Sequence, residues 1–169
     1  MMPSTMLQRK DICPGVGGNR FTPGYVVTRA TIAQILFARE GKPSVNGNNG
    51  FSDVSAGKLY TSAIAWAASK KLVSGYTNGN FGSNDLIARQ QMATFMYQYA
   101  KYKKLNKNAG GNISKYNDYK GVAPYAVTPM KWAVGNGIIS GTNKGLEPKG
   151  TATLAQIAVM LQAFDIIVG

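Results

Sequence analysis

The sequence predicts a helical fold built from a repeated unit. Trp66 and Trp132 each precede the glycine of a Ser-Gly pair, Gly75 or Gly141, by nine residues. A further partial copy precedes them, so the pattern recurs every 60 to 66 residues. Each copy also carries apolar residues at the spacing of a helix face. Repeats of this length are typical of arrays, which serve more often as binding scaffolds than as enzymes.

One helix is expected late in each of the three copies, because apolar residues recur there at i, i+3 and i+4. In register these residues are Ile32, Ile35 and Leu36, then Met92, Phe95 and Met96, then Ile157, Met160 and Leu161. The predicted helices cover roughly 28–40, 87–102 and 152–165. Thr28 is the expected N-cap of the first, and Gly41 followed by Pro43 ends it.

An earlier helix is expected in the second and third copies, over roughly 60–71 and 125–136. Gly137 is the expected C-cap glycine of the latter. Pro129 fits only if that helix starts near Thr128, so that the proline falls in its first turn.

These elements predict motif boundaries at 1–43, 44–109 and 110–169, which together form one domain. The first copy lacks its opening segment, and Met6 stands where the later copies have tryptophan. We therefore expect a chain that starts late or is a fragment of a longer one. Its first residues do not form the apolar core of a signal peptide, and no stretch approaches the ~20 apolar residues of a membrane span.

Composition narrows the possible functions. The 169 residues include 19 Lys and Arg against 7 Asp and Glu, a formal charge of +12. Such a surface favours anionic partners: nucleic acid, acidic membrane or an acidic wall polymer. Histidine is absent and Cys13 is the single cysteine, which excludes Ser-His and Cys-His pairs, an intrachain disulfide and a thiolate metal cage. No cofactor and no metal are expected.

The repeated anchors resemble a known family. The second copy opens with Phe51-x-Asp53-Val, continues through Trp66-Ala and Ser74-Gly75-Tyr, and ends with Ile87-x-Arg89. This order resembles the S-layer homology (SLH) motif. The stretch from 116 to 158 resembles a second full motif, and the stretch from 12 to 43 resembles the back half of a preceding one.

The resemblance implies an all-α fold in which three helix–loop–helix motifs, the first truncated here, form a pseudo-threefold domain around a central helical bundle. It also implies grooves between motifs that bind an anionic secondary cell-wall polysaccharide, often carrying pyruvylated N-acetylmannosamine. The implied role is non-catalytic anchoring of secreted or S-layer proteins to the Gram-positive cell wall. No specific nucleic acid and no membrane insertion are expected, and the oligomeric state is left open.

Arginine suits such a ligand because its planar fork can meet a carboxylate with two hydrogen bonds. The resemblance places Arg29 and Arg89 at the ligand-contacting position, at the start of a helix whose free N–H groups also favour an anion. The alternative is that the two arginines brace the loop that precedes their helices.

The other candidate ligand contacts also have structural alternatives. The two tryptophans could stack on a sugar, although packing is the favoured interpretation. The Ser-Gly pairs could let a ligand approach the backbone, or their glycines could serve a left-handed turn. The two aspartates could bind sugar hydroxyls, although capping a following turn or helix is favoured. These candidates are Trp66, Trp132, Ser74, Gly75, Ser140, Gly141, Asp53 and Asp118.

Three departures from the family pattern affect the expected sites. Leu154 replaces the arginine in the third copy, so that groove is expected to be inactive or altered. The usual glutamate two residues after the arginine is replaced by Thr31, Gln91 and Gln156, and Ala88 replaces a threonine.

Three alternative functions remain open at this stage. A wall-active enzyme is not indicated by any paired-carboxylate pattern, and its catalytic domain would have to lie outside this chain. Nucleic-acid binding is suggested only by charge, since the aromatic residues follow helix periods rather than a stacking platform. A degenerate remnant would explain Leu154 and the incomplete first copy.

Overall fold

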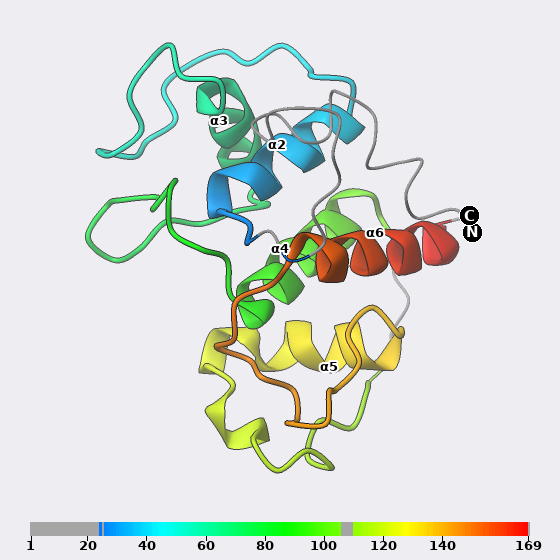
Figure 1. Cartoon of the computed structure of the whole chain (residues 1–169). Coiled ribbons are helices and arrows are strands. Elements are labelled where there is room, and N and C mark those ends of the chain that lie inside the picture. Colours follow the sequence, from blue (N-terminus) through cyan, green and yellow to red (C-terminus); the bar gives the residue numbers. More distant parts are fainter. Residues whose placement is uncertain (1–23, 25, 106–109, 169) are drawn as a thin grey trace. The chain divides into compact units, whose positions relative to one another are not determined.

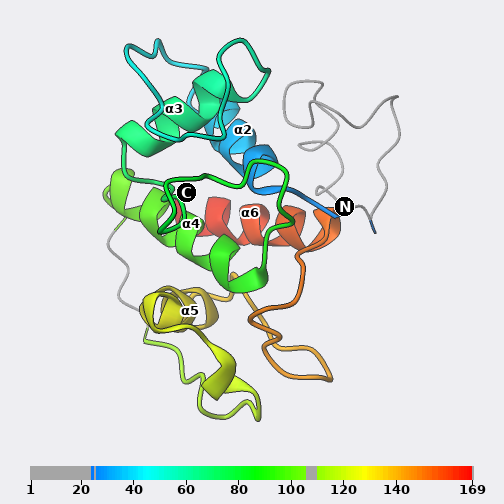
Figure 2. The ribbon, with the colours of Figure 1, turned by 90° about the vertical axis from the view of Figure 1, so that its left-hand side faces the viewer.

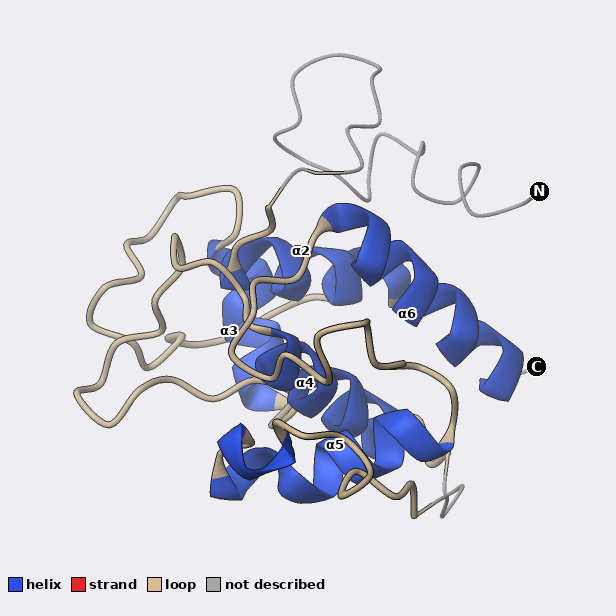
Figure 3. Cartoon of the chain, turned by 60° about the horizontal axis from the view of Figure 1, so that its bottom comes forward, coloured by secondary structure: helices blue, strands red, loops and turns tan. Residues whose placement is uncertain are grey.

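The computed structural model describes residue 24 and residues 26–105 and 110–168, and within them five α-helices and no β-strand. Figure 3 shows these helices joined by long loops. The helices are α2 (Arg29–Arg39), α3 (Thr61–Ser69), α4 (Arg89–Tyr102), α5 (Val127–Gly135) and α6 (Leu154–Val168). Two short 3₁₀ helices, η1 (Tyr119–Gly121) and η2 (Pro124–Ala126), precede α5. The all-α prediction is confirmed, while the pseudo-threefold arrangement stays a prediction. The first copy's expected features before residue 24 lie outside the described residues.

The chain forms two compact units. Unit 1 includes Val27–Leu86, with helices α2 and α3. Unit 2 includes Gly24–Val26 and Ile87–Gly169, with the remaining helices. Each unit is described by itself below.

Each unit contains one helix pair of the same kind. In unit 1, α2 packs on α3, and Phe37 contacts Trp66 with ring centroids 5.7 Å apart. In unit 2, α4 packs on α5, and Tyr97 contacts Trp132 at 5.5 Å (Figures 1 and 2). Each pair therefore joins the last helix of one sequence motif to the first helix of the next. The motif boundaries at 1–43, 44–109 and 110–169 stay a prediction.

The predicted helix ends are confirmed at several points. The N–H of Thr31 donates to the Thr28 hydroxyl, which makes Thr28 the N-cap of α2. Gly41 follows the end of α2 with φ +76°, and Gly137 follows the end of α5 with φ +69°. This left-handed conformation lets the chain leave a helix while its last carbonyls keep hydrogen-bond donors. Pro129 lies in the first turn of α5, where its missing N–H costs nothing.

Two helices end on a residue less suited to this conformation. Lys71 follows α3 with φ +58°, and Lys104 follows α4 with φ +57°. A Cβ atom is disfavoured in the left-handed region, so both positions carry backbone strain that glycine avoids elsewhere in the chain.

Candidate functional site

Arg29 lies at the centre of a loop-bracing cluster in unit 1. Although it stands first in helix α2, its side chain is only 3% exposed. Its Nε donates to the carbonyl of Phe81 at 2.8 Å, and its Nη2 donates to the carbonyl of Ser74 at 2.7 Å. The guanidinium also lies against the rings of Tyr76 and Phe81, 4.7 and 4.8 Å from their centroids. The cation therefore joins both arms of the loop between α3 and α4.

Arg89 repeats this arrangement in unit 2. It opens helix α4 and is 4% exposed. Its Nε donates to the carbonyl of Leu146 at 2.8 Å, and its Nη2 donates to that of Ser140 at 2.9 Å. Burial lowers the pKa of Arg89, an effect partly opposed by the charges of Glu147 and Asp118. An arginine guanidinium remains charged under such conditions.

Both arginines therefore brace a loop, as the alternative interpretation proposed, but the loop is a different one from the loop expected. Each arginine holds the loop of the following copy rather than the loop that precedes its own helix. Among the described residues, none accepts a hydrogen bond from Nη1 of Arg89. Whether either arginine also contacts a ligand stays a proposal.

The two aspartates hold the same loops from another side. Asp53 accepts hydrogen bonds from the N–H groups of Phe81 at 2.7 Å and Gly82 at 2.8 Å. Asp118 accepts from those of Leu146 at 2.9 Å and Glu147 at 2.7 Å. These partners lie 28 or 29 residues away, so the expected local caps are not formed.

The backbone of the loop is shaped to meet each carboxylate. Gly82 has φ +74° and Glu147 has φ +50°, which lets two successive N–H groups converge on one anion. Burial raises the pKa of Asp53 and Asp118, but these N–H groups and the nearby arginine outweigh it. The pKa of each aspartate therefore lies below its ordinary value, and both carboxylates are ionised at neutral pH.

The glycines of the Ser-Gly pairs are required by close packing. Neither Gly75 nor Gly141 has a positive φ, so the left-handed-turn alternative is wrong. A Cβ on Gly75 would lie 2.5 Å from Cε1 of Phe51, and a Cβ on Gly141 would collide with the ring of Tyr116. The aromatic residue that opens each full copy thus lies against the glycine of the same copy.

The serines contribute main-chain carbonyls to this bracing, while Ser74 and Ser140 are themselves exposed. The tryptophans take the packing role favoured from the sequence. Trp66 is 2% exposed and Trp132 is 7% exposed, and each contacts an aromatic ring of the paired helix. Sugar stacking by either indole stays a proposal for a ligand-bound state.

Two of the three departures two residues after the arginine position, the glutamines, have a local explanation. Gln91 accepts a hydrogen bond from the N–H of Ala88 at 3.0 Å, and Gln156 accepts one from that of Thr153 at 3.0 Å. Glutamine thus fills the N3 position of a capping box, a role open to glutamate and glutamine alike. Leu154 at the start of α6 is 2% exposed and packs as an apolar residue.

Several contributors were not identified from the sequence. The ring of Tyr76 over Arg29 and its hydroxyl bond to Asp85, 2.9 Å long, were missed, as was the bond of Thr142 to Glu147, 2.7 Å long. The signal available for Phe51 and Tyr116 was their recurrence at the start of each copy.

Within the described residues, no His, Cys, Asp or Glu group is arranged to hold a metal ion. Among the helices described, none has both the length and the apolar character needed to cross a bilayer.

Comparison with known proteins decides the family. The S-layer homology domain model matches residues 50–93 and 115–158, just over half of the chain. The chain belongs to the S-layer homology domain family. SLH domains anchor proteins to the cell wall and bind its secondary polymers. The two matches contain both full copies, including Asp53, Arg89 and Asp118.

Similar proteins include enzymes and a surface-layer protein. The chain is 29% identical over 159 residues to an amylopullulanase of Thermoanaerobacterium thermosulfurigenes, covering 92% of this chain and 8% of that protein. It is 27% identical over 157 residues to Exoglucanase XynX of Acetivibrio thermocellus, covering 92% and 14%. It is 26% identical over 153 residues to the surface-layer 125 kDa protein of Lysinibacillus sphaericus, covering 88% and 12%. The SLH chain thus spans about a tenth of the length of these relatives.

Proposed function

We propose that this SLH chain is a non-catalytic module that binds an anionic, pyruvylated secondary cell-wall polysaccharide at the outer surface of the cell. The observation that carries the proposal is the family match of both full copies, in which an arginine and an aspartate fix the same loop. A loop held in one conformation loses little entropy when it binds a ligand.

The charges of the loop support an anionic ligand. The loop of unit 2 contains Lys144 and Lys149, both exposed, against the single acid Glu147, and it lies beside Arg89. The Nη1 atom of Arg89 lacks a hydrogen-bond acceptor among the described residues. A carboxylate of a pyruvyl ketal would accept from that nitrogen while Nε and Nη2 keep the loop in place.

The relatives favour a second, compatible candidate. Two of the three compared proteins are named as polysaccharide-degrading enzymes, and the chain matches only a small part of each. We propose as this alternative that the chain is the anchor of a wall-associated enzyme whose catalytic domain lies outside it.

The test is sedimentation of the purified chain with peptidoglycan sacculi at physiological salt. The sacculi are prepared with the wall polymer intact, with the polymer removed by hydrofluoric acid, and with only the pyruvate removed. Binding to intact sacculi alone supports the proposal. Equal binding to all three, weakening with salt, would reduce the interaction to basic adhesion, and no binding would favour a degenerate remnant.

Two variants separate ligand contact from bracing, because one weakens the bracing and the other leaves it in place. Arg89→Lys keeps the positive charge but cannot make both loop contacts with one planar fork. Ser140→Ala removes an exposed hydroxyl and keeps the carbonyl that Arg89 binds. Circular dichroism checks that each variant is folded. Weaker sedimentation by a folded Ser140→Ala chain would assign the Ser140-Gly141 pair to the ligand site.

A further inference from the structure

A chemically labile pair of residues, asparagine followed by glycine, occurs four times in the sequence. Such an asparagine can lose its side-chain amide, because glycine has no Cβ to hinder the approach of its own backbone nitrogen. Since the dipeptide is the same each time, its surroundings in the fold decide which copy reacts. The pairs are Asn46-Gly47, Asn49-Gly50, Asn78-Gly79 and Asn136-Gly137.

The reaction joins two atoms of the pair. The glycine nitrogen gives up its proton and attacks Cγ of the asparagine side chain, which closes a succinimide ring and expels the side-chain nitrogen as ammonia. Water then opens the ring at either carbonyl and leaves aspartate or isoaspartate. A hydrogen bond that holds the glycine N–H or the asparagine amide elsewhere slows the reaction, because that bond must break first.

The pair at the end of helix α5 is held at both reacting groups. The Nδ2 of Asn136 donates to the carbonyl of Trp132 at 2.9 Å. The N–H of Gly137 donates to the carbonyl of Val134 at 3.1 Å. Both bonds must break before the ring can close.

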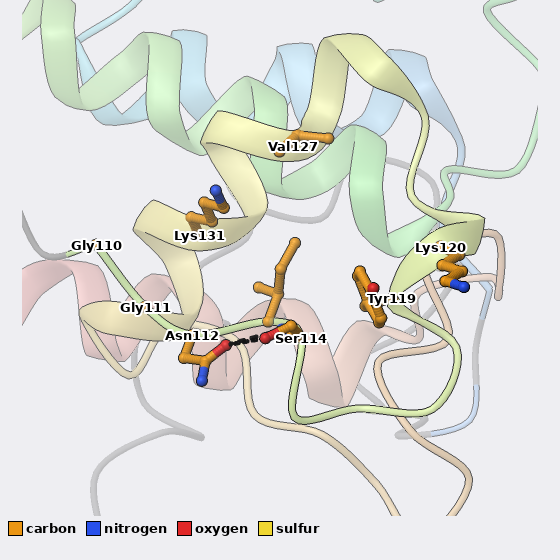
Figure 4. A pocket seen from close by; sticks show the side chains of 9 residues that line it. Gly110, Gly111, Asn112, Ser114, Tyr119, Lys120, Val127 and Lys131 are labelled. Atoms are coloured by element: carbon orange, nitrogen blue, oxygen red, sulfur yellow. Dashed lines mark hydrogen bonds between the residues drawn. The ribbon is translucent and has the colours of Figure 1, made fainter.

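The pair in the loop of unit 1 is held in a similar way. The Oδ1 of Asn78 accepts from the N–H of Asn80 at 3.0 Å, and the N–H of Gly79 donates to the carbonyl of Tyr76 at 3.1 Å. An asparagine oxygen bound to the N–H two residues on fixes the side chain over its own turn. Figure 4 shows an asparagine of the same kind beside a pocket of unit 2, where Oδ1 of Asn112 also accepts from the hydroxyl of Ser114 at 2.6 Å.

Two pairs lie in the link between α2 and the second copy (cyan in Figure 1), and one of them is held. The Oδ1 of Asn49 accepts from the N–H of Phe51 at 2.8 Å, and its Nδ2 donates to the carbonyl of Val54 at 3.2 Å. The N–H of Gly50 donates to Oδ1 of Asn48 at 3.2 Å. This asparagine therefore helps to shape the opening of the second copy.

Asn46-Gly47 is the exception. Both residues are exposed. Among the described residues, none accepts a hydrogen bond from the N–H of Gly47, and none bonds to the side-chain amide of Asn46. A Cβ placed on Gly47 would meet no atom within 4 Å, so the space around the attacking nitrogen is open. The two reacting groups can approach each other without breaking a contact of the fold.

We infer that Asn46 is the site at which the folded chain deamidates first, through a succinimide formed with Gly47. The product carries a carboxylate where the parent has a neutral amide, which lowers the formal charge of +12 by one. Asn46 takes no part in the printed bracing contacts of Arg29 or Arg89, so the modified chain keeps its fold. The inference concerns the chain's own chemistry and does not depend on the proposed wall-polymer function.

The test is incubation of the full chain in mildly alkaline water enriched in heavy oxygen, followed by peptide mapping with mass spectrometry. The isotope marks deamidation that occurred before digestion. We expect Asn46 to react about tenfold faster or more than each of the other three asparagines, because each of those must first break hydrogen bonds. In guanidinium chloride the four pairs should react at similar rates. The inference is overturned if a held pair reacts as fast as Asn46 in the folded chain, or if the same difference persists in the unfolded chain.

Two product-mimicking variants test whether the folded chain holds Asn46. Asn46→Asp should leave the midpoint of urea unfolding unchanged, because it removes no printed contact. Asn49→Asp is the matched control in the same link, and it should lower the midpoint because the Val54 carbonyl loses its donor and meets a carboxylate. An equal loss of stability in both variants would mean that Asn46 is also restrained, which would contradict the inference.

Discussion

Replacing Asp118 by asparagine should lower the free energy of unfolding at neutral pH by about 1–3 kcal/mol. The carboxylate accepts two backbone hydrogen bonds, 2.9 and 2.7 Å long, from Leu146 and Glu147. A hydrogen bond to a charged group contributes roughly 1.5–3 kcal/mol, and solvent at this half-buried site reduces the sum. Asparagine turns an N–H₂ group toward one of the two N–H donors, which then loses its partner.

The pH dependence of the free energy of unfolding gives a second, independent test of the role of Asp118. Burial raises the pKa of Asp118, but the N–H groups of Leu146 and Glu147 and the charge of Arg89 bring the folded pKa below its ordinary value. The unfolded chain therefore takes up the proton more readily than the folded chain. The stabilisation is fully present above the unfolded pKa and is lost as the pH falls through the folded pKa. The difference between Asp118→Asn and the parent should shrink toward about pH 2.

The assay is urea unfolding followed by tryptophan fluorescence, since Trp66 reports on unit 1 and Trp132 on unit 2. Asn117→Ala is the control, because it changes the exposed residue beside Asp118 and leaves the carboxylate in place. A penalty below about 0.5 kcal/mol for Asp118→Asn at neutral pH would refute the bracing role. Equal penalties at neutral and acid pH would refute the electrostatic explanation.

Three further substitutions test other parts of the same reasoning. Lys71→Gly should stabilise the chain by about 1 kcal/mol in thermal unfolding, because it places glycine at a left-handed helix end as Gly137 does in unit 2. Gly141→Ala should destabilise by about 1–3 kcal/mol because of the ring of Tyr116, and adding Tyr116→Leu should recover part of that loss in urea titrations. Arg89→Lys should cost about 1–3 kcal/mol in the same titrations, since a single ammonium cannot replace one buried and one part-buried bond to loop carbonyls; an unchanged midpoint would contradict this.

The sequence by itself determined the helices and their ends. Helical periodicity placed the helix over 87–102, observed at Arg89–Tyr102, and the helix over 60–71, observed at Thr61–Ser69. Thr28 and Gly137 were recognised because capping depends on residues within one turn of the helix end. These features follow from interactions between residues three or four positions apart, so they can be predicted from a short stretch of sequence.

Tertiary structure alone decided what the recurring polar residues do. Arg89 reaches Ser140 across 51 residues, and Asp118 reaches Leu146 across 28. Nothing local specifies such partners: the Arg89 contact depends on α4 packing against α5, and the Asp118 contact depends on the return of the loop after α5 to the start of the same copy. The same holds for Gly141, whose requirement comes from the approach of a ring 25 residues earlier rather than from its own backbone conformation. Recurrence in the sequence identified these residues, and only their long-range packing gave each one a physical role.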